Sequence, residues 1–265
     1  MKMGVRFQQI WFCFGLMALS GWGSGFAQAA EIRVAAASDL QFVFKQLAPL
    51  FERQSGHQLR VSFGSSGKFM SQIQQGAPFD LFLSADQKYV QHLHSQGLTQ
   101  DAGKLYAIGR IVLFAPKGSP LKPAKGLSGL TALLSQKKLT YLAMANPSHA
   151  PYGRAAQEAL TVSGLWSRLQ GHLLLGENAA QATQFALSGS CEGGILPLSL
   201  VLSAEMKGQG QFALIPENLH QPLRQRMVLT KGAGAAPREL YQFLQTGTVR
   251  QIFLRSGFGL PETEK

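Results

Sequence analysis

Small and hydroxyl-bearing residues gather in the stretch S-F-G-S-S-G-K-F at residues 62–69, where an apolar run gives way to a segment with helical character. The first turn of a helix presents backbone N–H groups that have no partner within the helix, and it carries a partial positive charge. Glycine lets a ligand approach that backbone closely, and serine adds an O–H donor. Residues 64–67 therefore predict a nest for a small oxyanion, although an ordinary serine cap would use the same residues.

Three further segments repeat this order of apolar run, small residues and helix start. They read A-A-A-S-D at 35–39, N-P-S-H-A-P-Y-G at 146–153 and G-E-N-A-A at 176–180. Open α/β sheets bind ligands at the carboxyl ends of their strands, which is where all four helix starts are expected. Neutral donors of fixed geometry could select an anion by size and charge state, because a proton on the anion would face an N–H group.

An enzymatic interpretation competes for the same residues. Ser65 and Lys68 form the S-x-x-K pattern of acyl-serine enzymes, in which the lysine assists attack by the serine. Those enzymes also need S-D-N and K-T-G later in the chain, and Lys231-Gly232-Ala233 lacks the threonine. A serine acyl enzyme using Ser65 and Lys68 is thus a remote alternative, and the glycines are too close together for a nucleotide P-loop.

Carboxylates and histidines offer weaker signals. Asp80 and Asp86 flank the apolar residues 81–83, which predicts a buried strand with capping acids rather than a catalytic pair. His92 and His94 are two residues apart on an expected helix, so they do not share a face. His149 lies near the predicted nest but could equally face solvent from a loop. A cation site is therefore disfavoured by ligand spacing.

The composition is that of a globular protein. Of the 265 residues, 45% are hydrophobic and 15% are charged, which excludes a disordered chain. The formal charge of +11 comes from scattered lysines and arginines, with no basic run interleaved with aromatic residues. A nucleic-acid interface is not indicated, although the charge could raise the local concentration of small anions.

The N-terminal segment predicts a secretory signal peptide over residues 1–29. Lys2 and Arg6 precede an apolar stretch at 7–20, and Ala27-Gln28-Ala29 fits the small-x-small cleavage pattern. An uncleaved anchor is the less favoured alternative, since the stretch is short for a membrane span. Cleavage would lower the formal charge from +11 to +9 by removing Lys2 and Arg6. It would also leave Cys191 as the one cysteine, so no internal disulfide is expected.

Strand-like and helix-like segments alternate over the rest of the chain. Strands are expected at 32–36, 59–63, 80–84, 107–115, 139–144, 172–175, 194–196 and 226–230, and helices at 40–53, 68–75, about 85–96, from 152, from 178, 239–244 and 249–254. This alternation predicts an α/β fold of mostly parallel sheets flanked by helices. Inter-domain clefts are common ligand sites, so two lobes would place the site between them.

The chain resembles the periplasmic molybdate-binding proteins, which are the substrate-binding components of molybdate ABC importers. The resemblance rests on A-A-A-S-D-L at 35–40, S-F-G-S-S-G at 62–67, Q-G-A-P-F-D-L-F-L-S-A-D at 75–86, N-P-x-x-A-P-Y-G at 146–153 and G-E-N at 176–178. It implies a two-lobed periplasmic binding protein of type II. Residues 30–109 plus 226–265 would form the first lobe and 110–225 the second, with the strand at 107–115 crossing between them.

The resemblance also assigns roles to individual residues. Ser38 and Ser66 would donate hydroxyl and backbone N–H groups to the oxyanion, and Tyr152 and Ala179 would donate backbone N–H groups. The backbone N–H of Asp39 is well placed, but its carboxylate would repel an anion, so we expect it to point away or to cap its helix. Some members use a tyrosine hydroxyl where this chain has Pro197, which can donate nothing, so the set of donors is expected to differ from theirs at this position.

The function implied by the resemblance is high-affinity binding of molybdate, and of tungstate, in the periplasm and delivery to a membrane ABC permease. The protein would be a monomer, would act on no covalent bond and would need no cofactor. It would bind no nucleic acid, and no cation would be held directly by its residues. A receptor for another tetrahedral oxyanion, such as sulfate or phosphate, is the main alternative.

Overall fold

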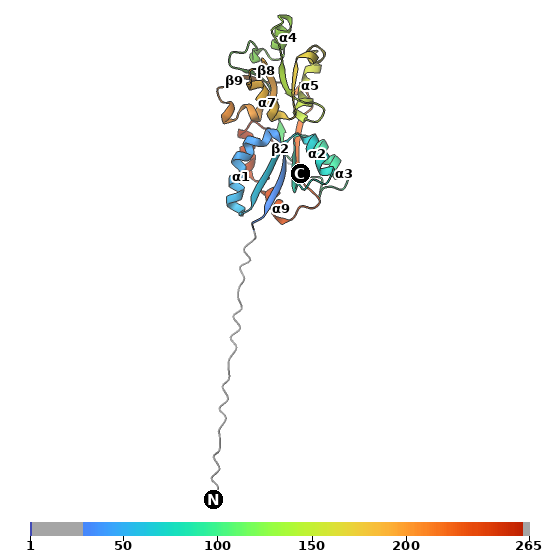
Figure 1. The fold of residues 1–265 in the computed structure, drawn as a ribbon, viewed down its shortest axis with the longest axis vertical. Coiled ribbons are helices and arrows are strands. Elements are labelled where there is room, and N and C mark those ends of the chain that lie inside the picture. The colour runs from blue at the N-terminus through green and yellow to red at the C-terminus, as the bar shows by residue number, and fades with distance from the viewer. Residues whose placement is uncertain (2–28, 262–265) are drawn as a thin grey trace.

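A computed structural model describes Met1 and residues 29–261, so the predicted signal peptide lies almost wholly outside the described residues. Two five-stranded sheets, each with helices on both faces, are stacked one above the other (Figure 1). We call the unit built on the first sheet the first lobe, and the unit built on the second sheet the second lobe. The two-lobed α/β fold expected from the sequence is confirmed.

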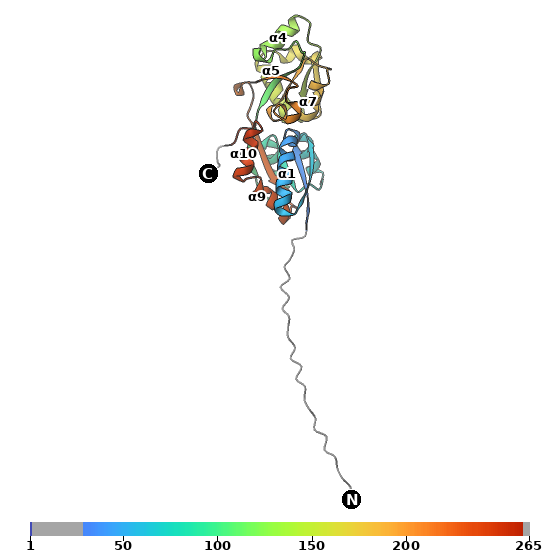
Figure 2. The same cartoon turned by 90° about the vertical axis from the view of Figure 1, so that its left-hand side faces the viewer.

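The first sheet has the strand order β2-β1-β3-β10-β4. Its strands are β1 (Glu31–Ala37), β2 (Gln58–Gly64), β3 (Leu81–Ser84), β4 (Lys104–Gly109) and β10 (Leu223–Leu229), and its helices are α1 (Gln41–Ser55), α2 (Ser66–Gln74), α3 (Gln87–Ser95), α9 (Ala235–Phe243) and α10 (Gly247–Arg255). Side chains alternate across the sheet. Leu81 and Leu83 pack with α1, α9 and α10, which share one side in Figure 2, whereas Phe82 packs with α2 and α3.

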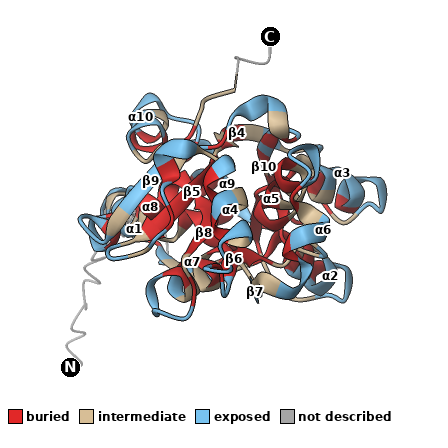
Figure 3. Ribbon diagram, turned by 90° about the horizontal axis from the view of Figure 1, so that it is seen from above, coloured by how far each residue is buried: buried red, intermediate tan, exposed pale blue. Residues whose placement is uncertain are grey.

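The second sheet has the strand order β7-β6-β8-β5-β9. Its strands are β5 (Ile111–Pro116), β6 (Leu142–Ala145), β7 (Leu173–Gly176), β8 (Gly193–Pro197) and β9 (Gly210–Leu214), and its helices are α4 (Ser128–Ser135), α5 (Pro151–Val162), α6 (Trp166–Leu169), α7 (Ala179–Leu187) and α8 (Leu198–Val201). The same alternation sends Leu113 toward α4 and α5, and Phe114 toward α7 and α8. The central strands β5, β6 and β8 are accordingly buried, whereas the edge strands β7 and β9 and the outer helix faces are partly exposed (Figure 3).

One strand in each sheet runs against the other four, β10 in the first sheet and β5 in the second. Both adjoin the connections between the lobes. The expected single strand at 107–115 is wrong, because the chain breaks at Arg110 into β4 and β5, which belong to different sheets. Gly109 at this break is required for space, since a Cβ there would lie 2.5 Å from the phenolic oxygen of Tyr152.

The chain returns from the second lobe between β9 and β10, and β10 begins at Leu223. The exact domain limits given from the sequence stay a prediction. Among residues 29–261, no helix combines the length and the apolar character needed to cross a bilayer.

Candidate functional site

Three of the predicted site residues lie in the first turns of helices. Ser66 and Ala179 are the first residues of α2 and α7, and Tyr152 is the second residue of α5. Backbone N–H groups at these positions have no acceptor within their own helix. No hydrogen bond between described residues uses these three N–H groups, although all three residues are buried. They are therefore available as donors to a ligand.

The hydroxyl groups of Ser38 and Ser66 are also oriented by the backbone. Ser38 begins a short 3₁₀ turn, η1 (Ser38–Leu40), and its Oγ accepts a hydrogen bond of 3.2 Å from Ala180 N. Ser66 Oγ accepts one of 2.9 Å from Ala85 N. A serine oxygen that accepts from the backbone still has its own proton to donate. Both side chains are thus oriented O–H donors, and Ser38 meets the start of α7 across the lobes.

The first turn of α2 contacts the loop before α5. Gly67 N donates to His149 O at 3.0 Å, and His149 Nδ1 lies 3.0 Å from Ser65 Oγ. A Cβ on Gly67 would lie only 2.7 Å from His149 O, so glycine permits this approach of the two backbones. Burial, the largest cause, lowers the pKa of His149. The contact with Ser65 is therefore made by a neutral imidazole at neutral pH.

Asp39 lies deep in the junction between the lobes. Its Oδ2 accepts hydrogen bonds from the phenol of Tyr152 at 2.8 Å and from Gln225 Nε2 at 2.7 Å. Its Oδ1 is buried without a partner among the described residues. Of the two orientations expected for Asp39, the helix cap is excluded, because neither η1 nor α1 has a side-chain cap, and the orientation away from an anion stays a prediction. The carboxylate instead reaches Tyr152 in the second lobe.

Burial raises the pKa of Asp39 to about 6, and the hydrogen bonds from Gln225 and Tyr152 only partly oppose this effect. Burial also raises the pKa of Tyr152 well above its ordinary value, and the charge of Asp39 adds to the shift. Tyr152 therefore keeps its proton and acts as a donor to the carboxylate.

Gln225 was not found by sequence analysis. It is fully buried in β10, where its Nε2 also lies 3.0 Å from the Tyr152 oxygen and its Oε1 accepts from Tyr106 at 2.7 Å. The pairing of β10 with β4 shifts register between Gln225 and Arg226. Such a bulge re-aims side chains. The available signal was a glutamine at an inward-facing position of the alternating stretch L-R-Q-R-M-V-L, in line with Leu223 and Met227.

Ser38 and Asp39 thus have direct contacts to the second lobe, whereas Ser66 reaches it through its neighbours Ser65 and Gly67. Ala179 takes part through the next residue, Ala180. Pro197 ends β8 in a buried position and has no N–H group to donate. The structure therefore brings the four predicted helix starts to one junction, and no direct hydrogen bond links Ser66 to the other four predicted residues.

The residues of the alternative interpretations have structural partners. Lys68 directs its ammonium group to Glu177 in the second lobe, and Ser65 Oγ caps α2 by accepting from Lys68 N. Asp86 caps α3 through Lys88 N at 2.8 Å, as expected. Asp80 is not a helix cap. Its carboxylate accepts hydrogen bonds from the backbone N–H and the guanidinium group of Arg33.

A cation site finds no support in the part of the chain that the structure describes. No group of three or more histidine, cysteine, aspartate or glutamate side chains there could hold a metal ion. Cys191 is a free, buried thiol whose pKa is raised by burial.

Two α/β lobes whose helix N-termini meet at a shared junction define a class of two-lobed binding protein. The chain belongs to the family described as bacterial extracellular solute-binding proteins, whose model matches residues 32–259. Its relatives are binding proteins, and the expectation that the chain is not an enzyme is confirmed.

Several relatives carry the name molybdate-binding protein ModA. The protein from Azotobacter vinelandii is 35% identical over 237 residues, covering 88% of this chain and 92% of the relative. The protein from Rhodobacter capsulatus is 33% identical, covering 88% and 89%. A solved structure, the periplasmic molybdate-binding protein of Azotobacter vinelandii, has a TM-score of 0.80 at 30% identity and covers 87% of this chain and 100% of that one.

Proposed function

We propose that the protein binds molybdate, and tungstate of nearly equal size, between its two lobes. The observation that carries the proposal is the meeting of first-turn N–H groups and oriented serine hydroxyls from both lobes at one junction. The names of the relatives favour molybdate among the tetrahedral oxyanions.

The donors are neutral, which suits a dianion that carries no proton. An unprotonated oxyanion can accept from every N–H and O–H group, whereas a protonated one would place a hydrogen against one of them. Charge-assisted hydrogen bonds contribute roughly 1.5–3 kcal/mol each, so several together support tight binding. The proposed donors are the backbone and hydroxyl groups of Ser38 and Ser66 and the backbone N–H groups of Asp39, Tyr152 and Ala179.

Binding is proposed to proceed by hinge closure in the periplasm. One lobe captures the anion, the other lobe closes on it, and the closed form docks as a monomer on a membrane ABC permease. The two chain connections, at Arg110 and between β9 and β10, are the segments where rotation of the lobes would occur. No covalent step and no cofactor are involved.

A thermal-shift series tests the proposal. A ligand at about 100 times its Kd stabilises a protein by about 2.7 kcal/mol, which corresponds to a rise of roughly 5–10 °C in the melting temperature for this chain length. We expect that rise with molybdate and tungstate, and a much smaller one with sulfate and phosphate. Stabilisation by sulfate or phosphate alone would favour the alternative oxyanion receptor, and stabilisation by zinc alone would contradict oxyanion binding.

A further inference from the structure

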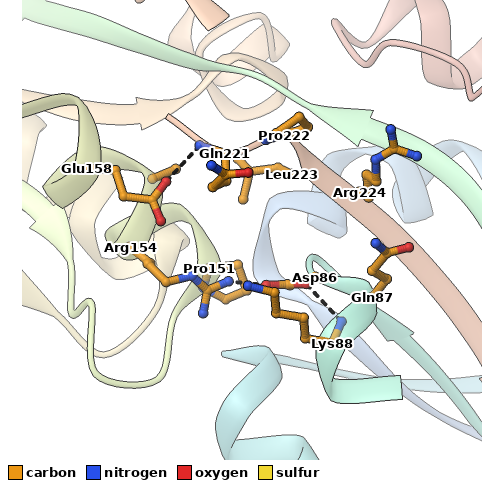
Figure 4. A pocket seen from close by; sticks show the side chains of 11 residues that line it. Asp86, Gln87, Lys88, Pro151, Arg154, Glu158, Gln221, Pro222, Leu223 and Arg224 are labelled. Atoms are coloured by element: carbon orange, nitrogen blue, oxygen red, sulfur yellow. Dashed lines mark hydrogen bonds and ion pairs between the residues drawn. The ribbon is translucent and has the colours of Figure 1, made fainter. Parts of the chain in front are cut away.

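An ion pair crosses between the lobes beside the proposed anion site. Arg154, in the first turn of α5, directs its guanidinium group to Oδ2 of Asp86, the residue that caps α3 (Figure 4). Each partner lies near a proposed ligand donor. Asp86 follows Ala85, whose N–H binds Ser66 Oγ, and Arg154 is two residues beyond Tyr152. The pair thus joins α5, which carries the proposed donor Tyr152, to the segment before α3, which contacts the proposed donor Ser66.

Among the residues that the structure describes, two other ion pairs also join the lobes, but they are more exposed. The side chains of Lys45 and Glu205 are 62% and 50% exposed, and those of Lys68 and Glu177 are 53% and 54% exposed. The side chains of Arg154 and Asp86 are 32% and 12% exposed. Solvent screens exposed pairs strongly, so the pair of Arg154 and Asp86 is expected to contribute most to holding the lobes together.

The geometry of Asp86 reduces the entropy lost when this pair forms. Its Oδ1 already accepts a hydrogen bond of 2.8 Å from Lys88 N, so the carboxylate is fixed before Arg154 arrives. A carboxylate held in this way loses little rotamer freedom on pairing. The other inter-lobe pairs are formed by lysine side chains, which are flexible.

A cavity of about 120 Å³ borders the pair and is lined by both lobes. Lys88, Arg224 and Glu158 also line it, and Glu158 accepts a hydrogen bond from Gln221 N at 2.7 Å. Among the described residues, Asp86 is the carboxylate that pairs with Arg154. Water and the nearby cationic side chains weaken the attraction between Arg154 and Asp86. The pair is therefore expected to change the dissociation rate of the anion by several-fold.

We propose that the ion pair of Arg154 and Asp86 is a latch that holds the lobes closed over the bound anion and sets the rate at which the anion leaves. The proposal rests on the proposed oxyanion binding and adds two positioning residues that need not touch the anion. The partners come from different lobes, so the latch favours the closed form. Its loss therefore affects dissociation more than association.

Rates of molybdate association and dissociation, measured by stopped flow, test the latch in Arg154→Gln and Asp86→Asn. Asparagine retains an acceptor for the cap of α3, so this change removes the charge while keeping the helix start. We expect both variants to release molybdate three to ten times faster, with association changed less than twofold. The double variant is expected to match the single variants, because either change alone breaks the pair.

The directions in which Arg154→Gln and Asp86→Asn change binding distinguish a latch from simple electrostatic attraction of the anion. If Arg154 acted only by attracting the anion, Arg154→Gln would weaken binding and Asp86→Asn would strengthen it. A latch predicts faster release in both. Opposite signs, additive effects or unchanged dissociation rates would overturn the proposal.

Arg33 and Asp80 supply a matched control within the first lobe. Their side chains are 43% and 12% exposed and 2.8 Å apart, and the pair does not cross the junction. Arg33→Gln is expected to lower the melting temperature without changing the dissociation rate.

The failure of the latch can be told apart from the failure of the proposed function. If the unaltered protein bound neither molybdate nor tungstate, both would be refuted. Tight binding with unchanged release in the variants would refute the latch alone.

Discussion

The carboxylate of Asp39 in the first lobe accepts a hydrogen bond of 2.8 Å from the phenol of Tyr152 in the second lobe. The other side-chain donor to the same oxygen is Gln225, so both of these hydrogen bonds come from neutral groups. A buried carboxylate without a cation is costly in its charged form. The junction between the lobes is therefore sensitive to the protonation of Asp39.

The pH dependence of stability follows from this pKa. The value of about 6 is above the ordinary 3.8, so the folded protein binds a proton to Asp39 more tightly than the unfolded chain does. The contribution of Asp39 is most favourable below the ordinary pKa and is lost as the pH rises through about 6. Lowering the pH from about 8 to about 5 is expected to gain about 1 kcal/mol from this group.

The variant Asp39→Asn isolates the effect, because other carboxylates titrate in the same range. The unfolding free energy of Asp39→Asn minus that of the unaltered protein should decrease as the pH is lowered from 8 to 5, because only the unaltered protein gains from protonation of Asp39. Chemical denaturation at several pH values measures it. A difference that does not depend on pH would show that Asp39 titrates normally.

Gly67→Ala tests the contact between backbones across the junction. The added Cβ would lie 2.7 Å from His149 O, and a backbone atom cannot move aside cheaply. We expect the lobes to close less completely and the affinity for molybdate to fall at least tenfold, as measured by isothermal titration calorimetry. The expected change in unfolding free energy is below about 1 kcal/mol, because alanine is the better helix former.

Gly247→Ala is the control for this prediction. Gly247 also lies in the first turn of a nine-residue helix, α10, and a Cβ there meets nothing within 4 Å. It should bind molybdate with unchanged affinity. Equal affinities of the two variants would mean that the contact between Gly67 and His149 plays no part in closure.

The sequence predicted the alternation of strands and helices because apolar runs and small-residue turns recur along the chain. It did not predict the break at Arg110, since A-I-G-R-I-V-L-F-A has the pattern of one long strand. The break follows from tertiary structure, in which β4 pairs with β10 and β5 pairs with β8. Pairing partners so distant in sequence are not visible in local periodicity.

The same limit applies to the site. Serine, glycine and helix-start signals indicated Ser38, Ser66, Tyr152 and Ala179, because these features are local. The two partners of Asp39 are distant in sequence: Tyr152 is 113 positions away and Gln225 is 186 positions away. Only the packed lobes bring them together.

Ser66→Ala is expected to weaken molybdate binding tenfold or more. The change removes a proposed O–H donor to the anion, and a hydrogen bond to a charged group contributes roughly 1.5–3 kcal/mol. It also leaves Ala85 N, which now donates to Ser66 Oγ at 2.9 Å, without that acceptor. Titration calorimetry and thermal unfolding would separate the two effects. Ser71→Ala, in the same helix but exposed, should preserve the affinity, and an equal result for both variants would remove Ser66 from the site.

Tyr152→Phe separates the phenol of this residue from its backbone N–H group. The proposed donor to the anion stays, but Asp39 loses one of the two side-chain hydrogen bonds to its Oδ2. We expect the affinity for molybdate to fall about tenfold at pH 8, which corresponds to about 1.4 kcal/mol for the lost bond. That bond lowers the pKa of Asp39, so the pKa should rise further in the variant. The loss of affinity should therefore be smaller at pH 5, where a protonated Asp39 needs the phenol less.

Tyr141→Phe, at an exposed position, should behave as the unaltered protein. A loss in Tyr152→Phe that is the same at both pH values would show that the phenol acts on the lobes independently of the charge on Asp39.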